Sequence, residues 1–348
     1  MLTEVPTNDS RARLGRWRTV LLFVVITLVA GEVAARVAEP LLPTPLRWPT
    51  AQIAEKADQM SQLAAQGAPI DVVFLGSSTV AQGIDPIAFN ESSDGLTSYN
   101  AALDGASARS LERWAFDVVI PTLDPEMVVI GVTTRDLNDH GRLGAELLQT
   151  MNVADGWKDF AATHTFRRLI DGVLHSSALV RIKSVLRTPA TTARQVTKGN
   201  EGLGTAMGPF GSYPARDATA PYHFETWRSL WMDSHLNDYT VGGEELAALD
   251  QLVARLLDED IRVTLVEMPV HPDYLRVQPG GIEGVAAWRE MVAGLASSRQ
   301  VPFLGSSSRY GPSDFYDPAH LNQAAAQDFA GHLVESLSTD GSPAAASP

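Results

Sequence analysis

The sequence predicts an α/β fold in which helices cover both faces of a parallel β-sheet. Five short segments are apolar at nearly every position, and longer segments with amphipathic, helical spacing alternate with most of them. Strands that are apolar at every position are typical of a parallel sheet buried on both faces. Strands that alternate with helices are typical of a doubly wound, three-layer architecture. With 348 residues, 45% of them apolar, the chain can bury a sizeable core.

Each expected strand is rich in Val, Ile, Leu or Phe, and the first one runs directly into Gly76, Ser77 and Ser78. The expected strands cover residues 71–76, 97–103, 127–132, 261–269 and 301–305. The expected helices cover residues 111–123, 242–260, 285–300 and 323–337.

The alternation defines a domain over residues 71–338, interrupted by one long segment. Residues 138–240 are rich in Trp, Gly, Pro and basic side chains, and we interpret them as an insertion over the edge of the sheet. Residues 39–70 form a proline-rich connector followed by a segment of helical composition. We expect residues 339–348 to be a disordered tail.

The N-terminal segment has the pattern of a membrane-targeting sequence. Residues 1–18 form a basic tail with four arginines just before an apolar run, and residues 19–38 approach the length that spans a bilayer if Glu32 and Arg36 lie at the outer interface. A retained signal-anchor is the favoured interpretation, with a cleaved signal peptide and a buried core helix as alternatives. Positive flanks stay in the cytoplasm, so we expect a single-pass protein of the cell membrane with an extracytoplasmic domain.

Composition excludes several classes of partner and site. The net charge is −14, and the acidic body has no basic stripe, which argues against nucleic acid. Cysteine is absent, so disulfides, thiolate nucleophiles and Cys-ligated zinc are excluded. His223 and His235 lie near Asp233 and Asp238, but their spacing matches no zinc motif, and we predict neither a metal nor another cofactor.

Candidate chemical groups follow the strand ends, where ligands bind in open α/β sheets. These residues are Ser78 after the first strand, Asn100 and Gly105 after the second, Thr133 and Arg135 after the third, His271 after the fourth, and Asp317 and His320 before the last helix.

A serine at such a turn can act as a nucleophile if a base lies within hydrogen-bond reach. Asp317 and His320 could supply and orient that base. Each residue alone also has a plain structural interpretation. Ser78 fits ordinary turn or cap chemistry, and Asp317 and His320 fit a helix cap and a solvated histidine. The joint placement of these residues at successive strand ends of one sheet favours a catalytic site.

Four segments, in chain order, resemble the sequence blocks of the SGNH/GDSL hydrolase superfamily. FLGSST (74–79) resembles the first block, with Ser77 where the family usually has Asp, and YNAALDGAS (99–107) resembles the second. IGVTTRD (130–136) lies at the third block, where Thr133 replaces the usual Asn, and DPAHLN (317–322) is similar to the fourth. The resemblance covers residues 71–137 and 242–337.

The resemblance implies a flavodoxin-like SGNH hydrolase fold and assigns roles to single residues. Ser78 would be the nucleophile, His320 its base, and Asp317 the group that orients the base. The oxyanion hole would be formed by Ser78, Gly105 and Thr133. The strand-end positions of Asn100, Arg135 and His271 make them possible substrate contacts. Arg135 could also stabilise the negative charge of the oxyanion.

The implied activity is acyl transfer: an extracytoplasmic serine esterase or O-acyltransferase. Similarity to the membrane-anchored branch of the superfamily suggests acyl esters, acetyl above all, of an envelope polysaccharide or a small molecule. A non-catalytic or weakly active protein that binds carbohydrate or assists envelope assembly is the alternative, because a fold does not guarantee an activity. The Thr133 departure favours the alternative, and Ser78, Asp317 and His320 oppose it.

Overall fold

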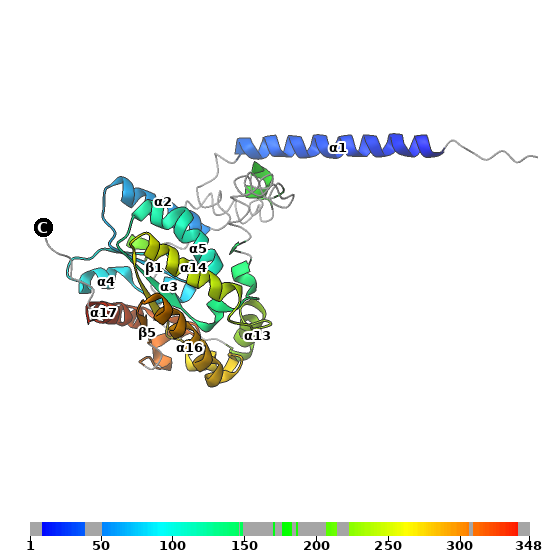
Figure 1. Ribbon diagram of the computed structural model, residues 1–348. Helices are drawn as coiled ribbons and strands as arrows, with labels where there is room; N and C mark the ends of the chain where they lie inside the picture. Colours follow the sequence, from blue (N-terminus) through cyan, green and yellow to red (C-terminus); the bar gives the residue numbers. More distant parts are fainter. Residues whose placement is uncertain are drawn as a thin grey trace, which may run out of the picture. The chain divides into compact units, whose positions relative to one another are not determined.

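The computed structural model divides the chain into two compact units. One comprises Met1–Pro49 and Val153–Asn200, the other Thr50–Asn152 and Glu201–Pro348. The structure describes residues 9–38, 51–145, 147–148, 170, 176–182, 186, 207–213, 223–305 and 309–339. Most of the expected insertion, and the expected tail from residue 340 onward, lie outside these ranges (Figure 1).

The first unit contains the long N-terminal helix α1, Asp9–Ala38. Its segment Trp17–Ala38 is long and apolar enough to cross a membrane, by length and composition alone, and its side chains are mostly exposed. The two charged side chains near its end are paired with each other, with 2.9 Å between Arg36 Nε and Glu32 Oε1. Glu32 also accepts hydrogen bonds from Ser177 Oγ and the Ala178 amide, at the start of the short helix α10, Ala178–Arg181.

The second unit is built on a five-stranded parallel sheet with the order β2-β1-β3-β4-β5. The strands are β1 Val72–Leu75, β2 Ser98–Asn100, β3 Met127–Val132, β4 Arg262–Glu267 and β5 Phe303–Leu304. The expected doubly wound parallel sheet is confirmed, with each strand inside or at its expected range. In this strand order the winding direction reverses between β1 and β3, which is where such sheets bind ligands.

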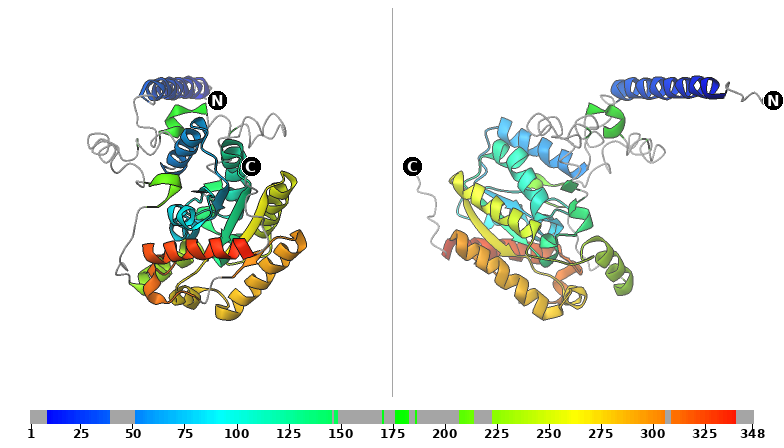
Figure 2. Two further views of the ribbon diagram at one scale, coloured as in Figure 1. Left: turned by 90° about the vertical axis from the view of Figure 1, so that its left-hand side faces the viewer. Right: turned by 45° about the vertical axis from the view of Figure 1, so that its right-hand side comes forward.

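Side-chain alternation along the strands separates two apolar cores. Val73 and Leu75 of β1 pack on one face, while Val72 and Phe74 pack on the other. The first face is covered by α2, α5, α14 and part of α16, and the second by α3, α4 and α17 (Figures 1 and 2).

The helices of this unit have the following bounds. The α-helices are α2 Ala51–Ala65, α3 Ser78–Gly83, α4 Pro86–Ser92, α5 Ala108–Trp114, α6 Ile120–Leu123, α13 Phe224–Ser234, α14 Glu244–Asp258, α15 Pro272–Val277, α16 Gly281–Arg299 and α17 Gln323–Thr339. The other helical turns are η3 Ala115–Val119, η4 Thr134–Leu137, η5 Pro209–Gly211 and η6 Pro312–Asp314.

The helix expected over 111–123 is regular only at its two ends. Between α5 and α6 the chain widens into the π-helical turn η3. Pro121 lies in the first turn of α6 and has no amide proton, and its ring collides with the carbonyl four residues earlier in a regular helix. A π-turn is a common way to absorb such a conflict.

Helix α2 begins inside the expected connector and belongs to the core. Ile53, Ala57 and Met60 are buried against the strands, and Lys56 lies among them with no exposed surface. Lys56 Nζ donates to the carbonyl oxygens of Asn100 and Gly211. Burial lowers the pKa of Lys56 to about 7, against the opposing influence of Asp104 and Glu55.

This buried lysine predicts an unusual dependence of stability on pH. Between about pH 7 and pH 10.5 the unfolded chain keeps the Lys56 proton and the folded chain has lost it, so the free energy of unfolding should rise with pH by up to about 1.4 kcal/mol per unit. Lys56→Met should remove this rise. Urea denaturation of wild type and Lys56→Met at pH 7.5 and 9.5 measures how the free energy of unfolding changes with pH. An equal change in the two proteins would contradict a neutral Lys56.

A two-stranded hairpin that the sequence analysis did not anticipate follows the sheet. Strand β6, Phe315–Asp317, pairs antiparallel with β7, His320–Leu321, across the turn Pro318-Ala319. Helix α3 packs against β7. The hairpin therefore brings Asp317 and His320 close to the turn between β1 and α3.

Candidate active site

The turn between β1 and α3 is held by close packing around two glycines. A Cβ on Gly76 would lie 2.7 Å from the carbonyl oxygen of Gly131 and 2.2 Å from a Val80 methyl. A Cβ on Gly131 would meet the same Val80 side chain at 2.3 Å. Real Cβ atoms do not approach other atoms so closely. Glycine at both positions therefore allows α3 to pack against the ends of β1 and β3. Ser78 is the first residue of this helix.

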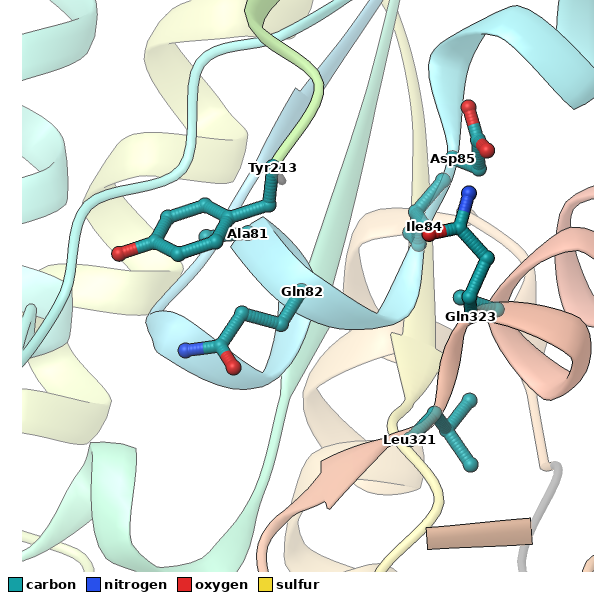
Figure 3. Close-up of a pocket in the computed structure, with 8 residues that line it drawn as sticks. Ala81, Gln82, Ile84, Asp85, Tyr213, Leu321 and Gln323 are labelled. Atoms are coloured by element: carbon teal, nitrogen blue, oxygen red, sulfur yellow. The ribbon is translucent and has the colours of Figure 1, made fainter. Parts of the chain in front are cut away.

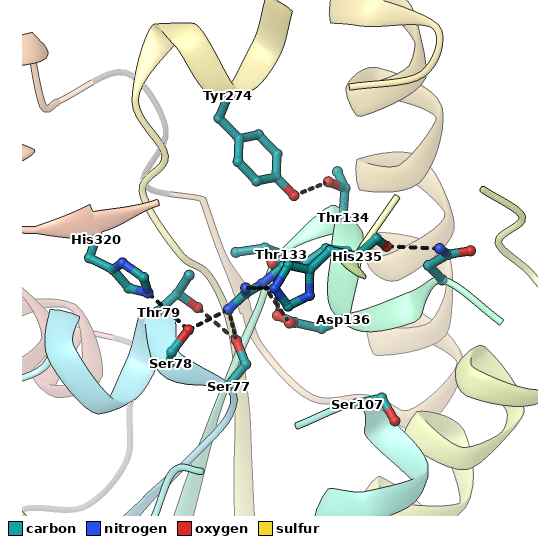
Figure 4. Close-up of polar contacts among 12 residues, drawn as sticks. Ser77, Ser78, Thr79, Ser107, Thr133, Thr134, Asp136, His235, Tyr274 and His320 are labelled. Carbon is teal, nitrogen blue, oxygen red and sulfur yellow. Dashed lines mark hydrogen bonds and ion pairs between the residues drawn. The ribbon is translucent and has the colours of Figure 1, made fainter. Parts of the chain in front are cut away.

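Ser78, His320 and Asp317 form a continuous hydrogen-bonded chain. The distance from Ser78 Oγ to His320 Nε2 is 2.9 Å (Figure 4). His320 Nδ1 lies 2.8 Å from Asp317 Oδ1 and 2.9 Å from Oδ2. The three side chains thus have the connectivity of nucleophile, base and orienting carboxylate.

The hairpin holds Asp317 in place through its own backbone. Asp317 Oδ1 accepts the amide protons of Ala319 at 2.9 Å and His320 at 3.0 Å. Burial disfavours the charged carboxylate, but the hydrogen bonds from His320 and these amides outweigh burial and lower the pKa of Asp317. Asp317 therefore stays ionised beside the imidazole.

Arg135, on the turn η4 that follows β3, also contacts Ser78. Its Nη2 donates to Ser78 Oγ at 2.7 Å and to Ser77 Oγ at 2.9 Å. The side chain is almost completely buried, with 5% of the residue exposed, and Nε lies 3.3 Å from Asp136 Oδ1. A permanent positive charge is thus fixed in contact with the serine oxygen.

The contacts of Ser78 are compatible with a hydroxyl proton that points to a neutral His320. Arginine has only donors, so Ser78 Oγ accepts from Arg135. A neutral His320 with its lone pair on Nε2 accepts the single hydroxyl proton of Ser78. His320 then carries its own proton on Nδ1, facing Asp317. This is the tautomer that a general base needs.

Thr133, whose hydroxyl was expected to contribute to the oxyanion hole, has that hydroxyl bonded to Asp136. Its hydroxyl donates to Asp136 Oδ2 at 2.8 Å, and its amide donates to the same oxygen at 2.8 Å. The single hydroxyl proton is therefore directed to Asp136 rather than to Ser78. Burial raises the pKa of Asp136, although Arg135 and the Thr133 donors oppose the rise.

Asn100 is engaged inside the protein and is not placed as a substrate contact. Its side-chain amide donates to the carbonyl oxygens of Val80 at 3.0 Å and Ile84 at 2.9 Å, and its Oδ1 accepts from the Ala102 amide at 3.1 Å. The residue has no exposed surface. Asn100 therefore ties β2 to α3, the helix that carries Ser78.

Gly105 and His271 lie on loops beyond the strand ends. Gly105 has a φ of +75°, a left-handed conformation that favours glycine. His271 Nδ1 accepts from the Asp273 amide at 2.9 Å, and its ring meets Phe315 of the hairpin edge-on. Burial lowers the pKa of His271, although Asp273 and Asp317 oppose the shift. The oxyanion role of Gly105 and the substrate contact of His271 stay predictions.

Two side chains that the sequence analysis did not assign to the site complete it. The guanidinium carbon of Arg135 lies 4.8 Å from the ring centroid of Trp231, on α13. Arg135 Nη1 lies 3.3 Å from His235 Nε2. The four-residue spacing of Trp227, Trp231 and His235 was the available signal, because it places all three on one helix face.

Other features near the site carry no assigned chemistry. Within the described part of the chain, no group of three His, Asp or Glu side chains could hold a metal ion. A hollow lies beside α3, and its lining does not include Ser78, Arg135 or the pair Asp317 and His320 (Figure 3). It is lined by Ala81, Gln82, Ile84, Asp85, Tyr213, Leu321, Gln323 and Ala326.

Comparison with known proteins finds similar structures but no matching sequence family. No protein-family model matches the chain, and no curated protein matches it. Similar solved structures include a putative acylhydrolase from Bacteroides fragilis, at 12% identity and a TM-score of 0.40, over 81% of this chain and 96% of the other. A GDSL-like lipase from Bacteroides thetaiotaomicron is similar at 10% identity and a TM-score of 0.38, over 82% and 98%. An acetylxylan esterase from Geobacillus stearothermophilus is similar at 11% identity and a TM-score of 0.39, over 76% and 93%.

Proposed function

We propose that this protein is a serine ester hydrolase of the SGNH type, with Ser78 as nucleophile, His320 as base and Asp317 as the orienting carboxylate. The observation that carries the proposal is the unbroken chain from Ser78 Oγ through the His320 imidazole to Asp317. A serine hydroxyl is a weak nucleophile without a base at this distance. The expected four sequence blocks supply these residues in the family's order.

The proposed reaction uses the hydrogen-bond connectivity of the site. Ser78 Oγ attacks the ester carbonyl carbon while its proton passes to His320 Nε2, and Asp317 stabilises the imidazolium that forms. The tetrahedral oxyanion forms beside Arg135 Nη2 and the Ser78 amide, a first-turn donor with no partner inside its helix. His320 then protonates the leaving alcohol. Water, activated by the same base, hydrolyses the acyl-enzyme.

Arg135 takes over the part expected of Thr133 in this proposal. The family's asparagine is absent, and the Thr133 hydroxyl is bonded to Asp136. The guanidinium already donates to Ser78 Oγ, which becomes the ester oxygen of the intermediate, and the oxyanion forms only two bonds away from that oxygen. A cationic donor forms a stronger hydrogen bond to an oxyanion than a neutral amide does.

The proposed substrates are acyl esters, acetyl above all, of an envelope glycan or a small molecule outside the cytoplasm. The apolar helix and its arginine-rich flank support this location. Transfer of the acyl group to another alcohol instead of water uses the same acyl-enzyme. Assays with p-nitrophenyl acetate and with acetylated oligosaccharides test the proposal. Acetate release is expected, and its absence from both substrates would favour the non-catalytic alternative.

The proposed topology predicts a protease-protection pattern. With the basic tail in the cytoplasm, protease added to intact spheroplasts should digest the chain after about residue 40 and spare the N-terminal segment. Immunoblotting with tags at the two ends measures this. A cytoplasmic protein of the same cells serves as the control for intactness. Full protection of the C-terminal tag would reverse the proposed orientation.

A further inference from the structure

Helix α13 and the residue that follows it contact the guanidinium group of Arg135. The Trp231 ring lies against the guanidinium, and His235 meets its Nη1 edge at 3.3 Å. The two rings also contact each other, with 4.4 Å between their centroids. Both residues come from the expected insertion, so a segment outside the sheet shapes the surroundings of the nucleophile.

The position of His235 is fixed by the same turn that carries Arg135. Asn138, three residues after Arg135, donates to the carbonyl oxygens of His235 at 2.8 Å and Asn237 at 3.2 Å. Its Oδ1 accepts the amide proton of Thr240 at 2.9 Å. This buried asparagine therefore locks the end of α13 to η4.

His235 is an acceptor in this contact and remains neutral. Burial lowers the pKa of His235 to about 2, and the nearby positive charge of Arg135 and the proximity of His320 add to the shift. Because arginine only donates, His235 Nε2 carries the lone pair and Nδ1 carries the proton. His235 therefore does not exchange protons during turnover at ordinary pH.

We propose that His235 is a positioning residue that holds the Arg135 guanidinium against Ser78. The inference rests on the proposed function and adds to it. Three edges of the guanidinium have partners: Nε faces Asp136, Nη1 faces His235, and Nη2 faces the serine hydroxyls. If the His235 acceptor is lost, Nη1 has no partner, and the guanidinium can turn toward the Asp136 carboxylate, which withdraws Nη2 from Ser78.

A matched pair of substitutions tests this contact. In His235→Gln the side-chain oxygen can reach the position of Nε2, whereas in His235→Asn it reaches only the position of Nδ1. We expect the Gln variant to keep kcat for p-nitrophenyl acetate within about 3-fold of wild type, and the Asn variant to lose roughly 10-fold with little change in KM. Equal kcat values for the two variants would overturn the proposal.

A double-mutant cycle shows whether His235 acts through Arg135. His235→Asn should cost almost nothing further in an Arg135→Met background, because the group that it positions is gone. Additive losses would show that His235 acts by another route and would overturn the inference. His332→Asn, at a partly exposed histidine of α17, is the matched control and should behave as wild type. Retained activity in Ser78→Ala would instead refute the proposed function itself, so the two failures are distinguishable.

Discussion

Ser78→Ala should lower the rate of ester cleavage by about 10³-fold or more, because the variant has no nucleophile for the base to activate. The change removes one oxygen that hydrogen-bonds to His320 and Arg135 and leaves the turn between β1 and α3 intact. Initial rates with p-nitrophenyl acetate measure the loss. Ser92→Ala, at the exposed end of α4, is the matched control and should retain the wild-type rate.

The other members of the chain should show the non-additivity of a single catalytic unit. His320→Ala should cost about as much as Ser78→Ala, and the double variant should be scarcely worse than either. Asp317→Asn should be milder than Ser78→Ala, because His320 keeps its place next to Ser78 and loses only its orienting charge. Additive losses in the Ser78 and His320 double variant would contradict a shared mechanism.

Arg135→Met should lower kcat by about 10²–10³-fold, the usual effect of losing one oxyanion donor. Methionine keeps much of the buried volume next to Trp231 but supplies no proton to Ser78 Oγ. It also leaves the buried Asp136 without its cationic neighbour, so thermal unfolding must show that the variant is folded at the assay temperature.

Thr133→Val provides the contrast within the same turn. The substitution removes a hydroxyl that donates to Asp136, so we expect a modest loss of stability and less than about 10-fold loss in kcat. If Thr133→Val proved more damaging to kcat than Arg135→Met, Thr133 rather than Arg135 would be the oxyanion donor.

The sheet was predictable because its signal is local. Each buried strand is a short apolar run. Ser78 and Arg135 follow the ends of β1 and β3, which are neighbouring strands, so both residues lie at the same edge of the sheet. The Asp317-x-x-His320 spacing was equally visible. Its hairpin was not, because β6 and β7 are only three and two residues long, which is shorter than the roughly four to eight residues over which periodicity indicates a strand.

Of the remaining parts of the site, the Thr133 contact is local, three residues from Asp136, whereas the contacts of Asn100 and His235 are tertiary and no local pattern encodes them. The sequence shows Thr133 in the place of the family's Asn, but only the capping of η4 by Asp136 reveals where its hydroxyl points. Asn100 likewise follows a strand end, yet its amide is directed inward to the carbonyls of α3. His235 meets Arg135 across 100 residues of sequence, and no spacing rule relates the two.

The most direct test of the central claim is reaction with a fluorophosphonate probe, which modifies only an activated serine. Mass spectrometry of the digested protein should find a single adduct on Ser78, absent from heat-denatured protein and lost together with ester cleavage in His320→Ala. An adduct on another serine, or no adduct on folded wild-type protein, would contradict the assignment of Ser78 as an activated nucleophile.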